Sequence, residues 1–255
     1  MAIHQAAQQG FSQESSTYQR GRPEYPAELR GWLAHDLGVK AGAAVVDLGA
    51  GTGKFTKLLA SLGAAVTAIE PVDAMRERLL QAVPGVRALP GSAEHMPLDD
   101  ASVDAVACAQ AFHWFANEAA LREIHRVLRR RGRLGLVWNV RDESVAWVAA
   151  ITKIITPYEG DAPRHYTGRW RQPFEAQSLF TPLQRRNLAH SHVDSFDQVV
   201  IDRFMSVSFI AALPETRKRE IEAQIRALQE VYPELRQETI AFPYQTEAWL
   251  SERVG

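Results

Sequence analysis

The sequence is short of the features that mark several classes of protein. Among 255 residues there is one cysteine, Cys108, so an internal disulfide cannot form, and neither the cysteine nor the histidines show metal-ligand spacing. Lysine and arginine (29) nearly balance aspartate and glutamate (30), which argues against a nucleic-acid-binding surface. No apolar run approaches membrane-spanning length, and residues 1–16 lack the pattern of a secretory signal. We therefore expect a cytoplasmic protein without a metal.

What the sequence does contain is a glycine turn between a buried strand and a helix, in the run AVVDLGAGTGKFTKLLA over 44–60. Apolar residues lead to Asp47, three glycines follow at alternate positions, and a helical pattern begins at once. This strand–turn–helix unit opens nucleotide-binding α/β folds. The last glycine of a dinucleotide fingerprint would fall at Lys54. Asp47, at the end of the strand, can instead accept hydrogen bonds from a cationic amino group, which favours S-adenosylmethionine.

Strands and helices alternate along most of the chain. The strands are nearly continuous apolar runs, which is typical of strands covered on both faces. This alternation predicts an α/β fold with a doubly wound, mostly parallel sheet and helices on both faces. The expected strands are 45–48, 65–69, 86–89, 103–109, 133–138, 183–193 and 239–253. The expected helices are 27–37, 53–62, 72–82, one through Leu121, Ile124, Val127 and Leu128, then 142–157, 195–210 and 215–231, with 158–182 irregular.

Polar residues follow several of the predicted strands. Glu70 ends the second strand, where an acid can accept hydrogen bonds from both ribose hydroxyls. Glu94 follows the third strand and could accept the adenine amino hydrogen, and the fourth strand ends in CAQAFHWF. Because ligands of open α/β sheets bind at the carboxyl ends of the strands, we expect these side chains to line one crevice.

The combined motifs resemble the class I S-adenosylmethionine-dependent methyltransferases, of the small-molecule type 11 group. The resemblance covers about residues 44–139, through VVDLGAGTGKFTKLL, AIEPVDAM, GSAEHMPLDDASVDAV, QAFHWF and LREIHRVLRRRGRLGLVWN. The flanking YQRGRPEYP, SVSFIAALPE and PYQTEAWL are similar to the trans-aconitate methyltransferase-like branch. The resemblance implies a Rossmann-like sheet of seven strands whose last strand is antiparallel and fed by a hairpin.

The resemblance also implies the residues that hold the cofactor, S-adenosylmethionine, and its product S-adenosylhomocysteine. Asp47 and the glycine turn would bind the methionine end, Glu70 the ribose, and the segment after the third strand the adenine. The implied cofactor residues are Asp47, Gly49, Ala50, Gly51, Gly53, Glu70, Pro71, Met75, Ala93, Glu94 and Gln110. No Asn/Asp-Pro-Pro-aromatic tetrad follows the fourth strand, so the signature of amino-group methylation on DNA or glutamine is missing.

The acceptor side is predicted less sharply. His113 could act as a general base, or it could only line the site, because proximity and alignment can carry a methyl displacement. Arg141 could bind a substrate carboxylate or lie on the surface. The stretch 18–26 could form a flap or a surface segment. The predicted acceptor-lining residues are Tyr18, Arg22, His113, Trp114, Trp138 and Arg141.

These expectations combine into a single domain with four parts. They are a tail, flap and helix over 1–37, a cofactor-binding core over 38–140, a cap insertion over 141–182, and the rest of the sheet with inserted helices over 183–255. The expected activity is methyl transfer to an O, N or C atom of a small organic acceptor, with neither nucleic acid nor membrane as partner. The alternatives are a non-catalytic S-adenosylmethionine-binding protein and, less favoured, an NAD(P)-dependent oxidoreductase. The oligomeric state stays open.

Overall fold

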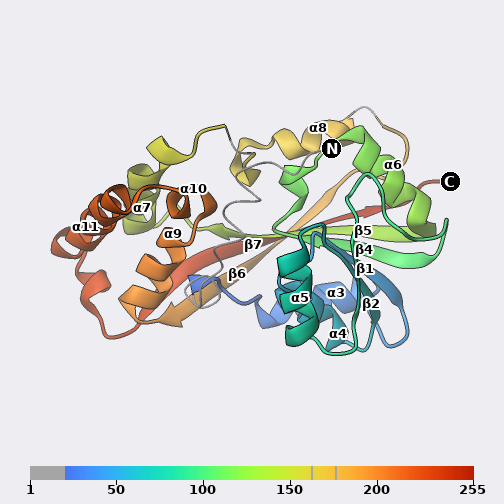
Figure 1. The fold of residues 1–255 in the computed structure, drawn as a ribbon, viewed down its shortest axis with the longest axis horizontal. Coiled ribbons are helices and arrows are strands. Elements are labelled where there is room, and N and C mark those ends of the chain that lie inside the picture. Colours follow the sequence, from blue (N-terminus) through green and yellow to red (C-terminus); the bar gives the residue numbers. More distant parts are fainter. Residues whose placement is uncertain (1–20, 162, 176) are drawn as a thin grey trace. The chain divides into compact units, whose positions relative to one another are not determined.

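The computed structural model describes residues 21–161, 163–175 and 177–255. One predicted flap residue, Tyr18, therefore lies outside the described residues. The chain forms a seven-stranded sheet with the order β3-β2-β1-β4-β5-β7-β6 (Figure 1). The strands are β1 (Ala44–Leu48), β2 (Ala65–Ile69), β3 (Arg87–Leu89), β4 (Val103–Ala109), β5 (Leu128–Arg141), β6 (Gln184–Asp194) and β7 (Ile240–Glu252).

The sheet is parallel from β3 to β5, and β7, the last strand in the sequence, runs antiparallel to β5. The pairs β1–β2, β1–β4, β2–β3 and β4–β5 are all parallel. The Asp142 amide donates to the Pro243 carbonyl (3.1 Å), and the Arg253 amide donates to the Gly132 carbonyl (2.8 Å). Residue numbers rise along β5 while they fall along β7, so this pair is antiparallel. The predicted fold class and its antiparallel last strand are confirmed.

The helices of the first half lie close to their predicted positions, and those of the second half are more broken. They are α3 (Ala27–His35), α4 (Lys54–Ala60), α5 (Asp73–Ala82), α6 (Glu118–Val127), α7 (Ala146–Ile155), α8 (Gln172–Glu175), α9 (Arg203–Met205), α10 (Ser208–Ala211) and α11 (Glu215–Val231). The single helix predicted over 195–210 is wrong. A π-helix (Asp197–Asp202), α9 and α10 occupy that stretch instead.

Strand β5 is longer than the sequence predicts. It was expected over 133–138 but begins at Leu128, which had been predicted as the last residue of the preceding helix. Between the pairs Val103–Leu128 and Ala105–Arg133, β4 advances two residues while β5 advances five. The extra residues bulge out of the ladder, and Arg131 takes a left-handed backbone angle (φ 60°) there. The pairing partner, and not local helix propensity, sets this boundary.

The chain divides into two compact units. One, here unit 2, contains 26–138, 163–188 and 246–255. The other, unit 1, contains the described residues up to Tyr25 together with 139–162 and 189–245, and its apolar core is built mainly by α7, the π-helix, α11 and β7. The four-part division of the chain made from sequence stays a prediction. In the described ranges, no helix is both long and apolar enough to cross a membrane.

Candidate functional site

The three glycines of the turn after β1 differ in their surroundings. Neighbouring atoms leave no space for a side chain at two of them, and the third faces open space. Gly49, Gly51 and Gly53 all have positive φ (72°, 57° and 88°), a region that favours glycine. A Cβ on Gly49 would lie 2.8 Å from the Ala111 Cβ, and one on Gly53 would lie 2.9 Å from the Leu79 Cγ. At Gly51 no described atom comes within 4 Å of that position. A ligand can therefore approach the backbone most closely at Gly51.

Asp47 is a buried carboxylate with one oxygen left over. Its side chain is 1 % exposed, and its Oδ2 accepts a 2.6 Å hydrogen bond from Thr56. Its Oδ1 has no hydrogen-bond partner among the described residues. Burial raises the pKa of Asp47 to about 7; the Thr56 hydrogen bond opposes this rise, and the nearby Glu70 charge adds to it. A buried acceptor of this kind is costly unless a ligand donates to it.

Glu70, at the end of β2, ties the glycine turn to the start of α5. Its Oε2 accepts a hydrogen bond from the Gly51 amide (2.9 Å), and its Oε1 accepts one from the Val72 amide (3.0 Å). The residue is 5 % exposed, and a carboxylate at this strand end can accept hydrogen bonds from ligand hydroxyls. Among the other cofactor candidates, Ala50 and Met75 are buried, whereas Pro71 is exposed.

A polar pair lies beyond β3 that sequence reasoning found only in part. Glu94 Oε1 accepts a 2.9 Å hydrogen bond from the Asn117 side-chain amide, and Ala93 beside it is buried. Asn117 also caps α6, because its Oδ1 accepts from the Ala120 amide at 2.8 Å. An asparagine just before a helical pattern is a recognisable cap signal. Its second contact, with Glu94, could not be foreseen from the sequence.

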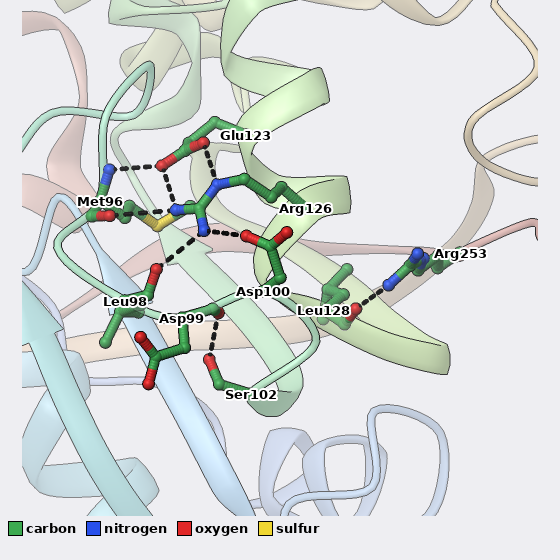
Figure 2. Close-up of polar contacts among 9 residues, drawn as sticks. All are labelled: Met96, Leu98, Asp99, Asp100, Ser102, Glu123, Arg126, Leu128 and Arg253. Carbon is green, nitrogen blue, oxygen red and sulfur yellow. Dashed lines mark hydrogen bonds and ion pairs between the residues drawn. The ribbon is translucent and has the colours of Figure 1, made fainter.

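Arg126 fixes the loop that carries Ala93 and Glu94 (Figure 2). Its guanidinium donates to the carbonyl oxygens of Met96 (3.1 Å) and Leu98 (2.8 Å) and pairs with Asp100. It also forms two hydrogen bonds with Glu123, one turn earlier on α6. These contacts fasten the loop after β3 to α6.

The end of β4 lies against the glycine turn. Gln110 has a left-handed backbone angle (φ 62°), and its amide donates to the Val137 carbonyl (2.8 Å). Such angles are strained for a residue other than glycine and are frequent at functional sites. The next residue, Ala111, is the one that leaves no space for a side chain at Gly49.

His113 is held by an indole. Trp138 Nε1 donates to His113 Nδ1 at 3.2 Å. Because an indole N–H can only donate, the neutral His113 ring carries its proton on Nε2. Burial, followed by the charges of His165 and Arg164, lowers the pKa of His113 to about 3. Trp114 lies beside the same ring, with centroids 5.3 Å apart.

Two further aromatic side chains and one carboxylate lie beside this cluster, and no local sequence pattern indicated them. Trp138 lies 4.5 Å from His165 and 4.6 Å from Trp170, centroid to centroid. His165 Nε2 lies 3.3 Å from a carboxylate oxygen of Glu247. His165 and Trp170 come from the stretch predicted as irregular, and Glu247 comes from β7, so only tertiary folding places them together.

Two acceptor candidates, Arg22 and Arg141, belong to unit 1, whereas all cofactor candidates belong to unit 2. Arg141 is 16 % exposed, and its guanidinium lies 5.2 Å from the centre of the Phe204 ring. Arg22 is partly buried, and its segment is held by a hydrogen bond from Asn139 Nδ2 to the Glu24 carbonyl (3.0 Å). No group of three or more metal-binding side chains occurs among the residues that the structure describes.

The fold and the glycine turn define a nucleotide-binding α/β protein, and comparison with known proteins narrows this class. The family model of the methyltransferase domain matches residues 46–136. An uncharacterised methyltransferase-like protein of Schizosaccharomyces pombe is 36 % identical over 245 residues, which are 95 % of each chain. An uncharacterised methyltransferase of Mycobacterium bovis is 40 % identical over 237 residues, 92 % of each chain. The chain belongs to the class I S-adenosylmethionine-dependent methyltransferases.

The solved structures agree on the fold. A proposed type II methyltransferase from Anaeromyxobacter dehalogenans superposes with a TM-score of 0.65 at 24 % identity, covering 91 % of this chain and 96 % of that one. At this level of identity the likeness concerns the fold alone. The similarity to the trans-aconitate branch stays a prediction.

Proposed function

We propose that the protein transfers a methyl group from S-adenosylmethionine to a small organic acceptor. The observation that carries this proposal is the buried Asp47, whose Oδ1 has no partner among the described residues, together with the open position at Gly51 in the turn that follows it. These two features fit S-adenosylmethionine. A carboxylate complements the cofactor's ammonium group, and a glycine backbone without side chains leaves space for its methionine part. When bound, S-adenosylmethionine supplies an activated methyl group on a sulfonium.

Each cofactor candidate then has a role that its surroundings support. Asp47 accepts hydrogen bonds from the amino group of the cofactor. The wall beside its methionine end is formed by Gly49, Ala50, Gly51 and Gly53. Glu70, which the Gly51 and Val72 amides hold in place at the end of β2, accepts hydrogen bonds from the ribose hydroxyls. The adenine is bordered by Pro71, Met75, Ala93 and Glu94, and Gln110 lies on the sulfonium side.

His113 is better suited to donate a hydrogen bond than to remove a proton. Its Nδ1 already accepts from Trp138, which leaves Nε2–H as the group available to an acceptor molecule. A base with a pKa near 3 is a poor proton acceptor at neutral pH. We propose that His113 and Trp114 orient the acceptor by hydrogen bonding and packing, so that alignment carries the displacement. Trp138, Arg22, Arg141 and Tyr18 remain proposed lining residues.

The decisive experiment measures cofactor binding and turnover on the full chain. We expect S-adenosylhomocysteine to bind in calorimetry, and a panel of small carboxylic, phenolic and amine acceptors to include one that yields S-adenosylhomocysteine from S-adenosylmethionine. Stabilisation by NAD(P) with no binding of S-adenosylhomocysteine would favour the oxidoreductase instead. Tight cofactor binding with no turnover across the panel would favour a non-catalytic binding protein.

His113→Phe should lower kcat/KM for the acceptor by about tenfold to a hundredfold, because one oriented donor is lost. Binding of S-adenosylhomocysteine should be unaffected. His113→Gln, which keeps a side-chain donor, should recover part of the loss, and His35→Ala, at an exposed position on α3, is the control. At saturating cofactor, kcat should show no step near pH 6.5. Such a step, if lost in His113→Gln, would identify His113 as a base.

A further inference from the structure

Arg203, on α9 in unit 1, is a buried cation without an acidic partner. The residue is 8 % exposed, and its Nε donates a hydrogen bond to the Tyr244 hydroxyl at 3.1 Å. Its Nη1 is buried and has no hydrogen-bond partner among the described residues. Within the residues that the structure describes, no carboxylate lies within salt-bridge distance of the Arg203 guanidinium. A buried charge is rarely left this way unless a ligand completes its hydrogen bonds.

A second arginine lies close to the first. The guanidinium carbons of Arg141 and Arg203 lie 5.2 Å and 6.0 Å from the centre of the same Phe204 ring. A carboxylate oxygen of Glu143 lies 3.9 Å from the Arg141 guanidinium, which is too far for a hydrogen bond, and Glu159 also acts on this cation. Burial, and then the charge of Arg203, lower the pKa of Arg141 to about 10. The two cations therefore repel each other in a largely dry environment, and an anion between them would remove this repulsion.

Tyr244 and Arg141 add hydrogen-bond donors to those of Arg203. Tyr244, which is 1 % exposed, uses a lone pair to accept from Arg203 Nε, so its own hydroxyl hydrogen remains available. Arg203 Nη1 and the Arg141 guanidinium add further donors. The Phe204 ring, and that of Phe242 at 4.9 Å from Tyr244, supply an apolar wall that strengthens electrostatic contacts. The carboxylates of Glu143 and Glu159 act on Arg141, and neither forms an ion pair with Arg203. Donors therefore outnumber acceptors at Arg203, which matches an oxyanion.

The backbone beside Arg203 is fitted to the predicted flap segment. A Cβ on Gly21 would lie 2.6 Å from the Arg203 amide nitrogen and 2.8 Å from its Cα. Only glycine fits at this position, so the segment beginning at Gly21 lies directly on α9. This contact is independent of the charges, and it joins the predicted acceptor flap to the same arginine.

We propose that Arg203, Arg141 and Tyr244 form an oxyanion-binding site in unit 1, which takes a carboxylate or phosphate group of the methyl acceptor. Assigning the anion to the acceptor rests on the proposed function. The presence of the site does not, and it can be tested without turnover.

The test is calorimetry on the full chain, with sodium malonate and sodium phosphate as probes at an ionic strength held constant with sodium chloride. We expect saturable binding of at least one probe, weakened roughly tenfold or more in Arg203→Met and less in Tyr244→Phe. Arg217→Met, at an exposed arginine of α11, is the matched control and should bind as the unmodified protein does. Tighter binding of malonate assigns a carboxylate, and tighter binding of phosphate assigns a phosphate.

Two results would overturn the site: neither probe binds the unmodified protein, or both bind Arg203→Met as well as the unmodified protein. If Arg203→Met does not fold, Tyr244→Phe carries the test, because it removes one hydroxyl only. S-Adenosylhomocysteine is titrated in parallel and should bind all variants equally. Failure of the proposed function appears differently, as absent S-adenosylhomocysteine binding while malonate or phosphate still binds.

Discussion

Asp47→Asn is expected to weaken S-adenosylhomocysteine binding by roughly a hundredfold at pH 8 while the protein stays folded. The substitution keeps the shape of the side chain and an oxygen to accept the Thr56 hydrogen bond, but it removes the charge that would face the ligand's ammonium group. It also removes a carboxylate whose ionised form burial destabilises. The melting temperature should therefore be raised, by less at pH 5 than at pH 8, because the cost of the raised pKa grows from the ordinary value of the group up to about pH 7.

The same carboxylate should make cofactor binding depend on pH. Since burial raises the pKa of Asp47 to about 7, the ligand-free side chain is mostly protonated at pH 6 and mostly ionised at pH 8. A cationic partner binds the ionised form, so affinity should rise by up to about tenfold per unit as pH increases toward 7, and then level off. Calorimetry between pH 5.5 and 8 measures this slope.

Two variants separate this explanation from others. Asp47→Asn should bind weakly with no slope over the same range, whereas Asp99→Asn, at an exposed carboxylate in the loop after β3, should keep both the affinity and the slope. An unchanged affinity in Asp47→Asn would remove Asp47 from the cofactor site. A slope that survives in this variant would assign the titration to another group.

Gly51→Ala should weaken cofactor binding while the protein stays folded, and Gly42→Ala provides a matched comparison. Both glycines have positive φ, 57° and 78°, and at neither would a Cβ meet a described atom within 4 Å. Each substitution therefore costs the same kind of backbone strain, about 1–2 kcal/mol. Only at Gly51, which donates to Glu70, should the new methyl group occupy ligand space and weaken binding by about tenfold to a hundredfold.

The measurements are thermal melting and S-adenosylhomocysteine calorimetry on both variants. Equal losses of melting temperature with binding lost in Gly51→Ala alone support the open position as the ligand cradle. Equal binding by the two variants would show that the space at Gly51 is not used, and the cradle would have to be sought elsewhere along the turn.

Local sequence was sufficient wherever a structure depends on chain neighbours. The strands Ala65–Ile69 and Val103–Ala109 match their predicted bounds, because each is an apolar run that ends at residues unsuited to a strand. Prediction was poorer where a distant partner sets the boundary. β5 extends well beyond 133–138, since β4 and β7 supply hydrogen bonds that its own sequence does not announce.

The sequence by itself determined the class of fold, the glycine turn, and the acids at the ends of β1 and β2, because residue spacing over a short stretch of chain indicates each of them. Tertiary structure alone decided which groups meet. It set Trp138 against His113, Asn117 against Glu94, and Tyr244 against Arg203. These partners lie 25, 23 and 41 residues apart, so their contacts arise from packing between elements, which no local pattern records. The sequence therefore indicates the methyl donor, whereas the acceptor site depends on these long-range contacts.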